Sequence, residues 1–325
     1  MIEISVCMIV KNEEDVLARC LNCVKQFADE IIIVDTGSKD QTKTIASNFT
    51  TNVFDFVWCD DFSKARNFAF GKATKDFKMW IDADDVILDE DIKKIKDLKK
   101  RLTSDVDIVL MKYHTAFDEH GNPSFTYYRE RLINAKSHVS WEGVIHEVIP
   151  LIGKLQYEDI AITHRKEHVA DPDRNIKIFE GLIEKGVILS PREQFYYARE
   201  LYYHKRYVDA IHEFRMFLDG KQGWVENNID ACEMMGYCCY YVNREEDALR
   251  CYFESFMYDT PRAELCCDIG QHLFDRGKWR QAMYWFKAAT HCQMNLESGG
   301  FVRRECYDEF PRKRIAICES ILGKK

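Results

Sequence analysis

Apolar and polar positions follow two different patterns along the chain. From residue 1 to about 112, short apolar runs alternate with stretches of helical periodicity that begin near residues 13, 40 and 63. The runs are rich in β-branched and aromatic residues and read "ISVCMIV", "EIIIVD", "VFDFVW", "FKMWID" and "VDIVLMKY". Such alternation predicts a mostly parallel, Rossmann-like sheet with helices on both of its faces.

From about residue 175 onward, long helical patterns rich in Tyr, Phe, Ala and Leu replace the short runs. Three similar segments place Ala210, Ala248 and Ala282 at the same point of a second helix, at intervals of about 38 and 34 residues. A small residue there lets two helices approach closely, and the spacing fits tetratricopeptide-type hairpins. We therefore predict an α/β domain over residues 1–170 and an all-α repeat domain over residues 171–325, joined by strand ends and a linker.

Composition and charge narrow the class of protein. The 325 residues carry a net charge of −8, which disfavours nucleic acid or an anionic membrane as the main partner. No stretch approaches the roughly 18 apolar residues of a membrane span, and the N-terminus does not read as a signal peptide. The 13 cysteines, an odd number, indicate reduced thiols and a cytoplasmic protein. Cys20 and Cys23 form a CxxC on one amphipathic stretch, and we interpret them as packing residues.

Polar residues follow the apolar runs of the first half at regular places. In an open parallel sheet the carboxyl ends of the strands lie along one edge, and ligands bind there. We therefore expect the polar residues after the first four runs to form a site. They include Glu13, Asp35, Asp60, Asp61, Asp82 and Asp84.

The stretch "WIDADDV" crowds three carboxylates into four positions, which repel one another unless a cation lies between them. Asp82 and Asp84 are two residues apart, so in an extended segment they point to the same side. They can share one hard ion, Mg²⁺ or Mn²⁺, which also neutralises a bound diphosphate. A solvated acidic turn or a helix cap is the alternative explanation.

Two further segments suit a nucleotide. Asp35 ends a strand before a Gly-containing turn, where an acid can accept hydrogen bonds from a ribose or a base edge. Lys64 and Arg66 stand next to Asn67 at a predicted helix start, and cations at a helix N-terminus suit phosphate oxygens. The alternative is a solvated helix face.

Taken in order, "ISVCMIVKNEEDVLARCL", "IIIVDTGSKDQT", "DDFSKARNFA" and "WIDADD" resemble the successive motifs of family 2 glycosyltransferases with the GT-A fold. The likeness covers about residues 1–150, and "YYRERLINAKSHVSWEGVIHEVI" resembles the motif that closes this domain. The branch with appended tetratricopeptide-like repeats includes bacterial peptide and protein glycosyltransferases, among them the bacteriocin S-glycosyltransferases.

The resemblance implies a UDP-sugar donor, a divalent metal at the acidic motif, and inverting transfer by direct displacement. On this chain, Asp35 would contact the nucleoside, and Arg66 with Asn67 would line the nucleotide pocket. Asp82 and Asp84 would bracket the metal and the diphosphate.

Inverting transfer needs a base for the acceptor proton and a charge sink for the departing nucleoside diphosphate. The metal and Arg66 are candidates for the sink. The segment "WEGVIHEVI" offers Glu147 as base, with Glu142 as a second candidate, and His146 as a third metal ligand or a further catalytic residue. Arg129 and Arg131 alternate along a predicted strand and are expected to face the diphosphate or the acceptor.

The acceptor is expected to be a peptide or protein side chain, because stacked helical hairpins form an extended binding surface. The repeats would hold this acceptor or mediate a homodimer. Three alternatives stay open: a glycan or small-molecule acceptor, a non-catalytic repeat scaffold, and a phosphatase of the haloacid-dehalogenase type, whose nucleophile motif "DADDV" also matches.

Overall fold

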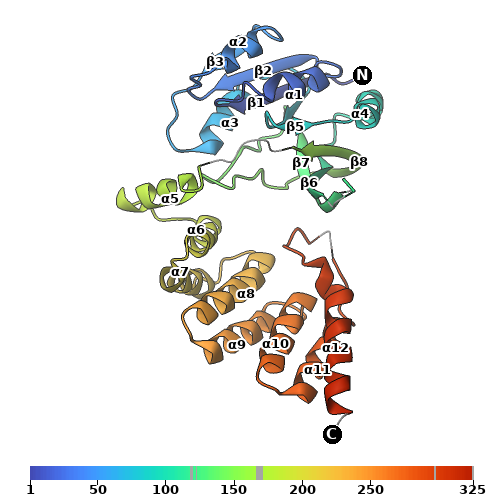
Figure 1. Ribbon diagram of the computed structural model, residues 1–325. Coiled ribbons are helices and arrows are strands. Elements are labelled where there is room, and N and C mark those ends of the chain that lie inside the picture. The colour runs from blue at the N-terminus through green and yellow to red at the C-terminus, as the bar shows by residue number, and fades with distance from the viewer. Residues whose placement is uncertain (118–119, 122, 166–170, 296–297, 324–325) are drawn as a thin grey trace. The chain divides into compact units, whose positions relative to one another are not determined.

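The computed structural model describes residues 1–117, 120–121, 123–165, 171–295 and 298–323. The chain forms two compact units, residues 1–174 and 175–325, coloured from blue to green and from yellow to red in Figure 1. Each unit has hydrophobic clusters of its own. The boundary that we predict after residue 170 adjoins residues 166–170, which lie outside the described part.

The first unit alternates strands with helices, as the apolar runs predict. Each early strand is a run of β-branched and aromatic residues, and polar residues or a glycine turn end it. The elements are β1 (Ile4–Val10), α1 (Leu17–Val24), β2 (Glu30–Asp35), α2 (Thr42–Ser47), β3 (Val53–Asp55), α3 (Phe62–Phe70), β4 (Phe77–Trp80), β5 (Asp85–Val86), α4 (Asp89–Arg101), β6 (Ile108–Phe117), β7 (Pro123–Asn134) and β8 (Leu155–His164).

The described strands form one mixed sheet in the order β3-β2-β1-β4-β7-β6-β8-β5. Strands β1 to β4 pair in parallel, so their carboxyl ends share one edge. β7 pairs antiparallel with β4 and β6, and β5 pairs antiparallel with β8. The prediction of strand ends and a linker was wrong for β8, a continuous ten-residue strand between β6 and β5. Charged residues in "LQYEDIAITH" interrupt the apolar pattern by which a strand is predicted.

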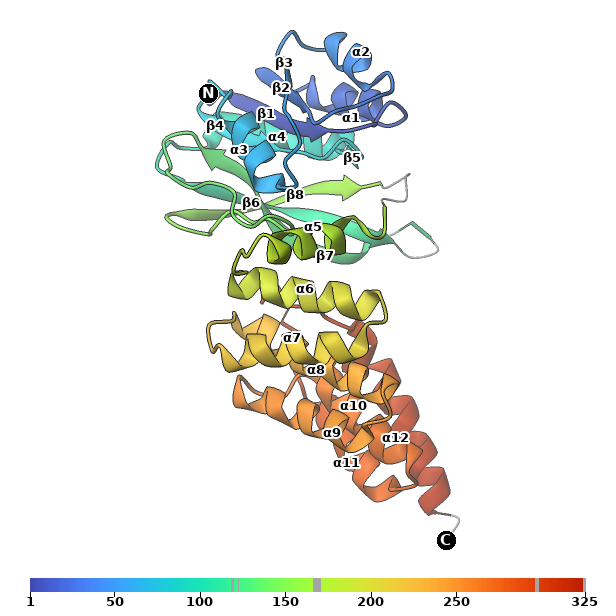
Figure 2. The same cartoon turned by 90° about the vertical axis from the view of Figure 1, so that its left-hand side faces the viewer.

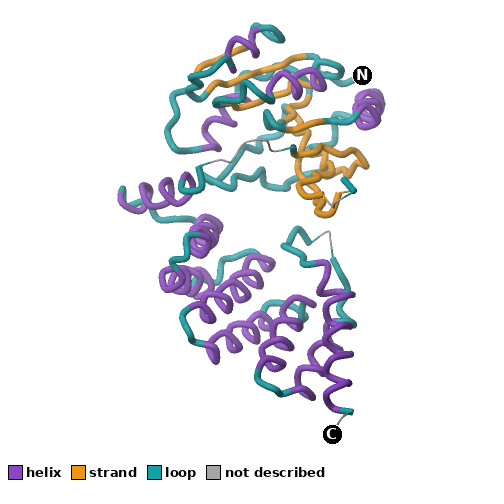
Figure 3. Tube along the Cα trace, viewed as in Figure 1, coloured by secondary structure: helices purple, strands orange, loops and turns teal. Residues whose placement is uncertain are grey.

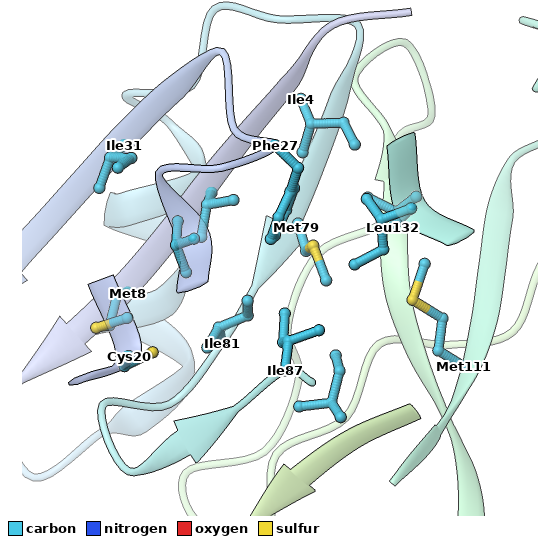
Figure 4. Close-up of a cluster of buried hydrophobic side chains, with 14 of the residues drawn as sticks. Ile4, Met8, Cys20, Phe27, Ile31, Met79, Ile81, Ile87, Met111 and Leu132 are labelled. Carbon is cyan, nitrogen blue, oxygen red and sulfur yellow. The ribbon is translucent and has the colours of Figure 1, made fainter. Parts of the chain in front are cut away.

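Alternate residues of β1 face opposite sides of the sheet. Ile4 and Met8 lie on the side covered by α1 and α4, in the cluster that Figure 4 shows together with Cys20. Cys7 lies on the other side, in a cluster with Phe70 of α3. Cys20 is therefore a packing residue, as predicted, and helices cover both faces of the sheet.

The second unit consists of helices, drawn purple in Figure 3. Figures 1 and 2 show consecutive helices side by side as hairpins. Its elements are α5 (Arg174–Glu184), α6 (Pro191–Tyr203), α7 (Tyr207–Asp219), α8 (Val225–Tyr241), α9 (Glu245–Glu254), the short helix η1 (Ser255–Met257), α10 (Ala263–Asp275), α11 (Trp279–Ala289), the short helix η2 (Arg304–Tyr307) and α12 (Glu309–Leu322).

The three hairpins predicted from the repeated segments are α6–α7, α8–α9 and α10–α11, and the alanines of their second helices are fully buried. The sequence pattern did not reveal the matching feature of the first helices. A Cβ on Gly236 would lie 2.2 Å from the Tyr252 ring, and one on Gly270 would lie 2.7 Å from the Phe286 ring. Each glycine thus admits an aromatic ring from the second helix of its own hairpin.

Replacing Gly236 with Ala should therefore lower the free energy of unfolding by about 1 to 3 kcal/mol, because the added methyl group overpacks the hairpin. Gly181 in α5 is the matched control, since a Cβ there meets no atom within 4 Å. Gly181→Ala should stabilise the chain by up to about 1 kcal/mol through helix propensity. Urea unfolding of both variants tests this, and equal shifts in the same direction would contradict it.

All 13 cysteines are free thiols. Ten are buried, Cys23 and Cys292 are half-buried, and Cys59 in the loop before α3 is exposed. Among the helices of the described residues, none combines the length and the apolar character that a bilayer crossing requires.

Candidate active site

The ends of β1 and β2 lie side by side, since Val10 pairs with Asp35. Asp35 is buried, and its Oδ1 accepts hydrogen bonds from the backbone N–H groups of Gly37 and Ser38, both at 2.9 Å. Gly37 adopts φ +106°, a conformation that glycine tolerates in so tight a turn. The Oδ2 of Asp35 is buried without a hydrogen-bond partner. An unsatisfied buried acceptor is costly, so it suits a ligand that brings a donor.

The loop after β1 is tied to the start of α2. The backbone N–H of Glu13 donates to Thr42 Oγ1 at 2.7 Å, and that of Glu14 donates to Asp40 Oδ2 at 3.2 Å. Asp40 Oδ1 also accepts from the Thr42 N–H at 3.0 Å, so it satisfies the first turn of the helix. Glu13 thus lies in an anchored loop at the ligand edge, and its role in binding stays a prediction.

The acidic stretch after β4 forms a turn rather than the extended segment that we expected. The Asp85 N–H donates to the Asp82 carbonyl at 3.1 Å, and the Asp82 N–H donates to Asp85 Oδ2 at 3.1 Å. The turn separates the charges, because Asp82 contacts Arg66 while Asp84 lies 3.4 Å from His164 Nδ1. Opposite charge on each side relieves the repulsion that extended carboxylates would suffer.

Arg66 of α3 joins two acids that are far apart in sequence. Its Nη2 lies 2.9 Å from Asp82 Oδ1 and its Nε lies 2.6 Å from Glu147 Oε1, with 11% of the side chain exposed. The guanidinium lies over Trp80 and Trp141, at 5.1 and 4.8 Å from the rings. Burial disfavours its charge, but the two carboxylates outweigh burial and raise its pKa. For Asp82, burial opposes ionisation, yet the guanidinium prevails and the pKa is lowered.

Lys64 and Asn67, predicted with Arg66 to bind the nucleotide, have other contacts. The Lys64 side chain is 69% exposed and lies 3.2 Å from Asp61, whose carboxylate caps α3. Asn67 donates to the Trp141 carbonyl and accepts from the Trp141 N–H, both at 2.9 Å. The Asn67 side-chain amide thus makes two hydrogen bonds to the backbone of Trp141, and it positions the loop that begins there.

That loop, residues 141–148, carries the candidates for the base. Two backbone hydrogen bonds between Glu142 and Val148, at 2.9 and 3.0 Å, close it. Glu142 is exposed, and His146 is half-buried with φ +53°. Glu147 pairs with Arg66, which also pairs with Asp82, so one guanidinium links Glu147 to the acidic turn. The loop therefore presents acids beside the predicted diphosphate site.

A histidine that sequence reasoning missed completes the other side of the turn. His164 ends β8, and its Nδ1 lies 3.4 Å from carboxylate oxygens of both Asp84 and Asp85. Within the described residues, these three form the one group of three or more candidate metal ligands, and His146 does not belong to it. The sequence signal was that His164 ends the alternating run of residues 155–164. We missed it because we interpreted that run as part of a linker.

The prediction that Arg131 faces a ligand was wrong. The side chain is fully buried, 3.4 Å from Asp85, and its guanidinium lies 3.6 Å from the centre of the Trp80 ring. Strand alternation places it inside, where an acid and an aromatic face compensate its charge. Arg129 pairs with Glu130 at 2.9 Å, and 25% of its side chain is exposed.

The profile of the family described as "Glycosyl transferase family 2" matches residues 5–150. The match spans β1 to the loop after β7, and it includes the acidic turn, Arg66 and the base candidates. Residues 5–150 form a glycosyl transferase family 2 domain. Within this domain the carboxyl edge of β1 to β4 is the place of the candidate site, and the phosphatase alternative is wrong.

Two curated relatives and one solved structure illustrate the likeness. The chain is 44% identical over 88 residues to a TPR repeat-containing protein of Synechococcus elongatus, covering 27% of this chain and 22% of that protein. It is 25% identical to the prophage-derived glycosyltransferase SunS of Bacillus subtilis, over 81% of this chain and 64% of the relative. The chain thus spans less than two thirds of either relative.

Among solved structures, TarS 1–349 of S. aureus in complex with UDP-GlcNAc aligns with a TM-score of 0.44 and 14% identity, over 78% of this chain and 91% of that one.

Proposed function

We propose that the chain is a metal-dependent, inverting glycosyltransferase that takes a hexose or N-acetylhexosamine from a UDP-sugar. The observation that carries this proposal is the acidic turn of the family 2 domain, with Arg66 on one side and His164 on the other. The turn follows β4 at the edge where parallel strands place ligands.

Asp84 and His164 fit a divalent metal. A carboxylate with water and phosphate oxygens suits Mn²⁺ or Mg²⁺, and the imidazole favours the transition metal Mn²⁺. Hydrogen bonds to Asp84 and Asp85 raise the pKa of His164 to about 10, so a bound metal would take the place of the proton on this ring. A bound metal would neutralise charge on a nucleoside diphosphate. Asp82 would line the diphosphate side, where Arg66 already offers a positive charge.

Asp35 would bind the nucleoside. Its Oδ2 is a buried acceptor without a partner, and a base N–H or a ribose hydroxyl supplies the missing donor. Arg66 would stabilise the leaving diphosphate as the bond to the sugar breaks. Glu147 is the candidate base, with Glu142 and His146 in the same loop as further candidates.

The polypeptide acceptor is proposed on the helical unit. The face formed by α8 and α10 holds a shallow recess whose walls include Glu226, Asp230, Glu233 and Glu264. Residues 298–303 run along this face without helix or strand. Arg303 lies 2.7 Å from Glu233 and 2.8 Å from Asp268, so the face already accepts an extended segment with a basic side chain. An extended acceptor with a basic residue suits it.

Two assays test the proposal separately. Incubation of the full chain with UDP-glucose or UDP-N-acetylglucosamine and Mn²⁺ should release UDP slowly, whereas a scaffold releases none. Addition of basic peptides should speed UDP release and add one sugar mass to the peptide. UDP release that rises only with glycan or small-molecule acceptors would refute the polypeptide acceptor but keep the transferase.

The recess also predicts a pH dependence of stability. Burial raises the pKa of Asp230 to about 7, against the opposing effect of Arg199, which lies at 3.3 Å. Because the folded chain then holds this proton more tightly than the unfolded chain, stability falls as the pH rises from about 4 to 7. The loss should be on the order of a few kcal/mol. Urea unfolding at pH 5 and pH 8 should show a smaller difference for Asp230→Asn than for the unsubstituted chain.

A further inference from the structure

Asp85 is the most enclosed acid of the acidic turn. It belongs to β5, its side chain has no exposed surface, and it pairs with His164 in the strand ladder. Neither the motif spacing, which singles out Asp82 and Asp84, nor the proposed function gives it a task. A fully buried carboxylate is expensive unless donors surround it, so its contacts decide what it does.

Three donors from three segments hold the carboxylate, and the His164 ring lies beside it. Oδ1 accepts from the Tyr113 hydroxyl of β6 at 2.9 Å and lies 3.4 Å from His164 Nδ1 of β8. Oδ2 accepts from the backbone N–H of Asp82 at 3.1 Å and from Arg131 Nη1 of β7 at 3.4 Å. An ionised carboxylate has about four lone-pair sites. Three of these sites therefore have a donor in the protein, and the remaining one lies next to His164.

Arg131 supports this arrangement from behind. Its guanidinium is sandwiched between Trp80 and Tyr113, at 3.6 and 4.3 Å from the rings, and it also donates to the Trp80 carbonyl at 3.2 Å. A wholly buried ion pair adds little net stability compared with apolar packing, but it fixes the positions of the groups it joins. Here these are the end of β4 and the start of β5.

We propose that Asp85 is a positioning residue for the metal site and not one of its ligands. Its Oδ2 holds the backbone of the turn at Asp82, and Tyr113 holds its Oδ1. Asp84 and Asp85 both lie 3.4 Å from Nδ1 of His164, so a metal on this nitrogen would take the place of its proton. Asp84 is then the carboxylate ligand, because its side chain is 22% exposed whereas Asp85 is fully buried among its other donors. The inference rests on the proposed metal dependence, and partners behind the ligands tune metal affinity in this way.

Calorimetric titration of Mn²⁺ alone into metal-free full-length chain tests the proposal without turnover. Asp85→Asn should weaken Mn²⁺ binding about 10- to 100-fold, the usual effect of losing an outer partner. In turnover, the Mn²⁺ concentration for half-maximal rate should rise by a similar factor, while the rate at saturating Mn²⁺ changes much less. Tyr113→Phe removes one donor to Asp85 and should weaken binding several-fold.

Lys99→Met is the matched control, because Lys99 is 9% exposed and forms an ion pair with Asp29 at 2.6 Å in the same unit. It should lower stability without changing Mn²⁺ affinity. Unchanged affinity in a folded Asp85→Asn chain overturns the proposal, and if that variant does not fold, unchanged affinity in Tyr113→Phe overturns it. An unsubstituted chain that binds no Mn²⁺ and turns over donor without metal refutes the proposed metal role itself, and this inference with it.

Discussion

Replacing Asp84 with Asn should lower metal-stimulated turnover of the UDP-sugar by about 10²- to 10³-fold, the scale seen when one charge-stabilising group is removed from an active site. The reason is that the metal and the diphosphate lose a charged anchor, while the fold keeps its packing because the side chain is 22% exposed. UDP release with Mn²⁺, and again after addition of EDTA, measures the effect.

Asp55→Asn is the matched control. Asp55 ends β3 at the same edge of the sheet, with 74% of its side chain exposed, and it pairs with Lys43. Its replacement should leave turnover unchanged. Full turnover of Asp84→Asn, or full turnover of the unsubstituted chain in EDTA, would show that no metal acts at this turn.

Replacing Arg66 with Met is expected to reduce both stability and turnover. The variant leaves Asp82 and Glu147 close together without their shared cation. Breaking a fully buried pair costs about 3–5 kcal/mol, and we expect about 2 to 4 kcal/mol here because the Asp82 side chain is 31% exposed. Turnover at saturating donor, measured where the variant is fully folded, should also fall, since the leaving diphosphate loses a positive charge.

Urea unfolding and UDP release of the same preparations separate the two effects. Lys64→Met serves as control, because this lysine is two positions away on the same helix, is 69% exposed and contacts Asp61 only at the surface. It should change neither quantity measurably. If Arg66→Met kept full turnover at conditions where it is folded, the guanidinium would be a structural group and not the charge sink.

Local pattern predicted much of the fold. The four parallel strands follow from β-rich runs that end in polar residues, and the hairpins follow from the spacing of Ala210, Ala248 and Ala282. The strands rest on neighbours within a few positions, and the hairpins rest on a regular repeat along the chain, so neither requires a contact between distant segments to be known. The acidic turn and Arg66 were also predicted to be close, because parallel strands bring their carboxyl ends to one edge.

Pairings across long stretches of chain were not predictable in this way. Asn67 meets the backbone of Trp141 over 74 positions, and Asp85 meets His164 over 79. Arg131 was expected to face a ligand because it alternates with Arg129 along a predicted strand, but it is buried against an acid 46 positions away. Such partners depend on strand order, which the periodicity of a single strand does not contain.

Because the thiols differ in exposure, a dimer of this chain can be held by a disulfide bond as well as by non-covalent contacts. Ten of the 13 cysteines are buried, and Cys59 is the exposed one. Air oxidation will therefore join two chains first through Cys59, in the first unit, by a disulfide bond. Such a species runs as a dimer on a non-reducing gel whatever the helical repeats do. A dimer that persists in reductant, or in a Cys59→Ser chain, is the one that bears on association through the repeats.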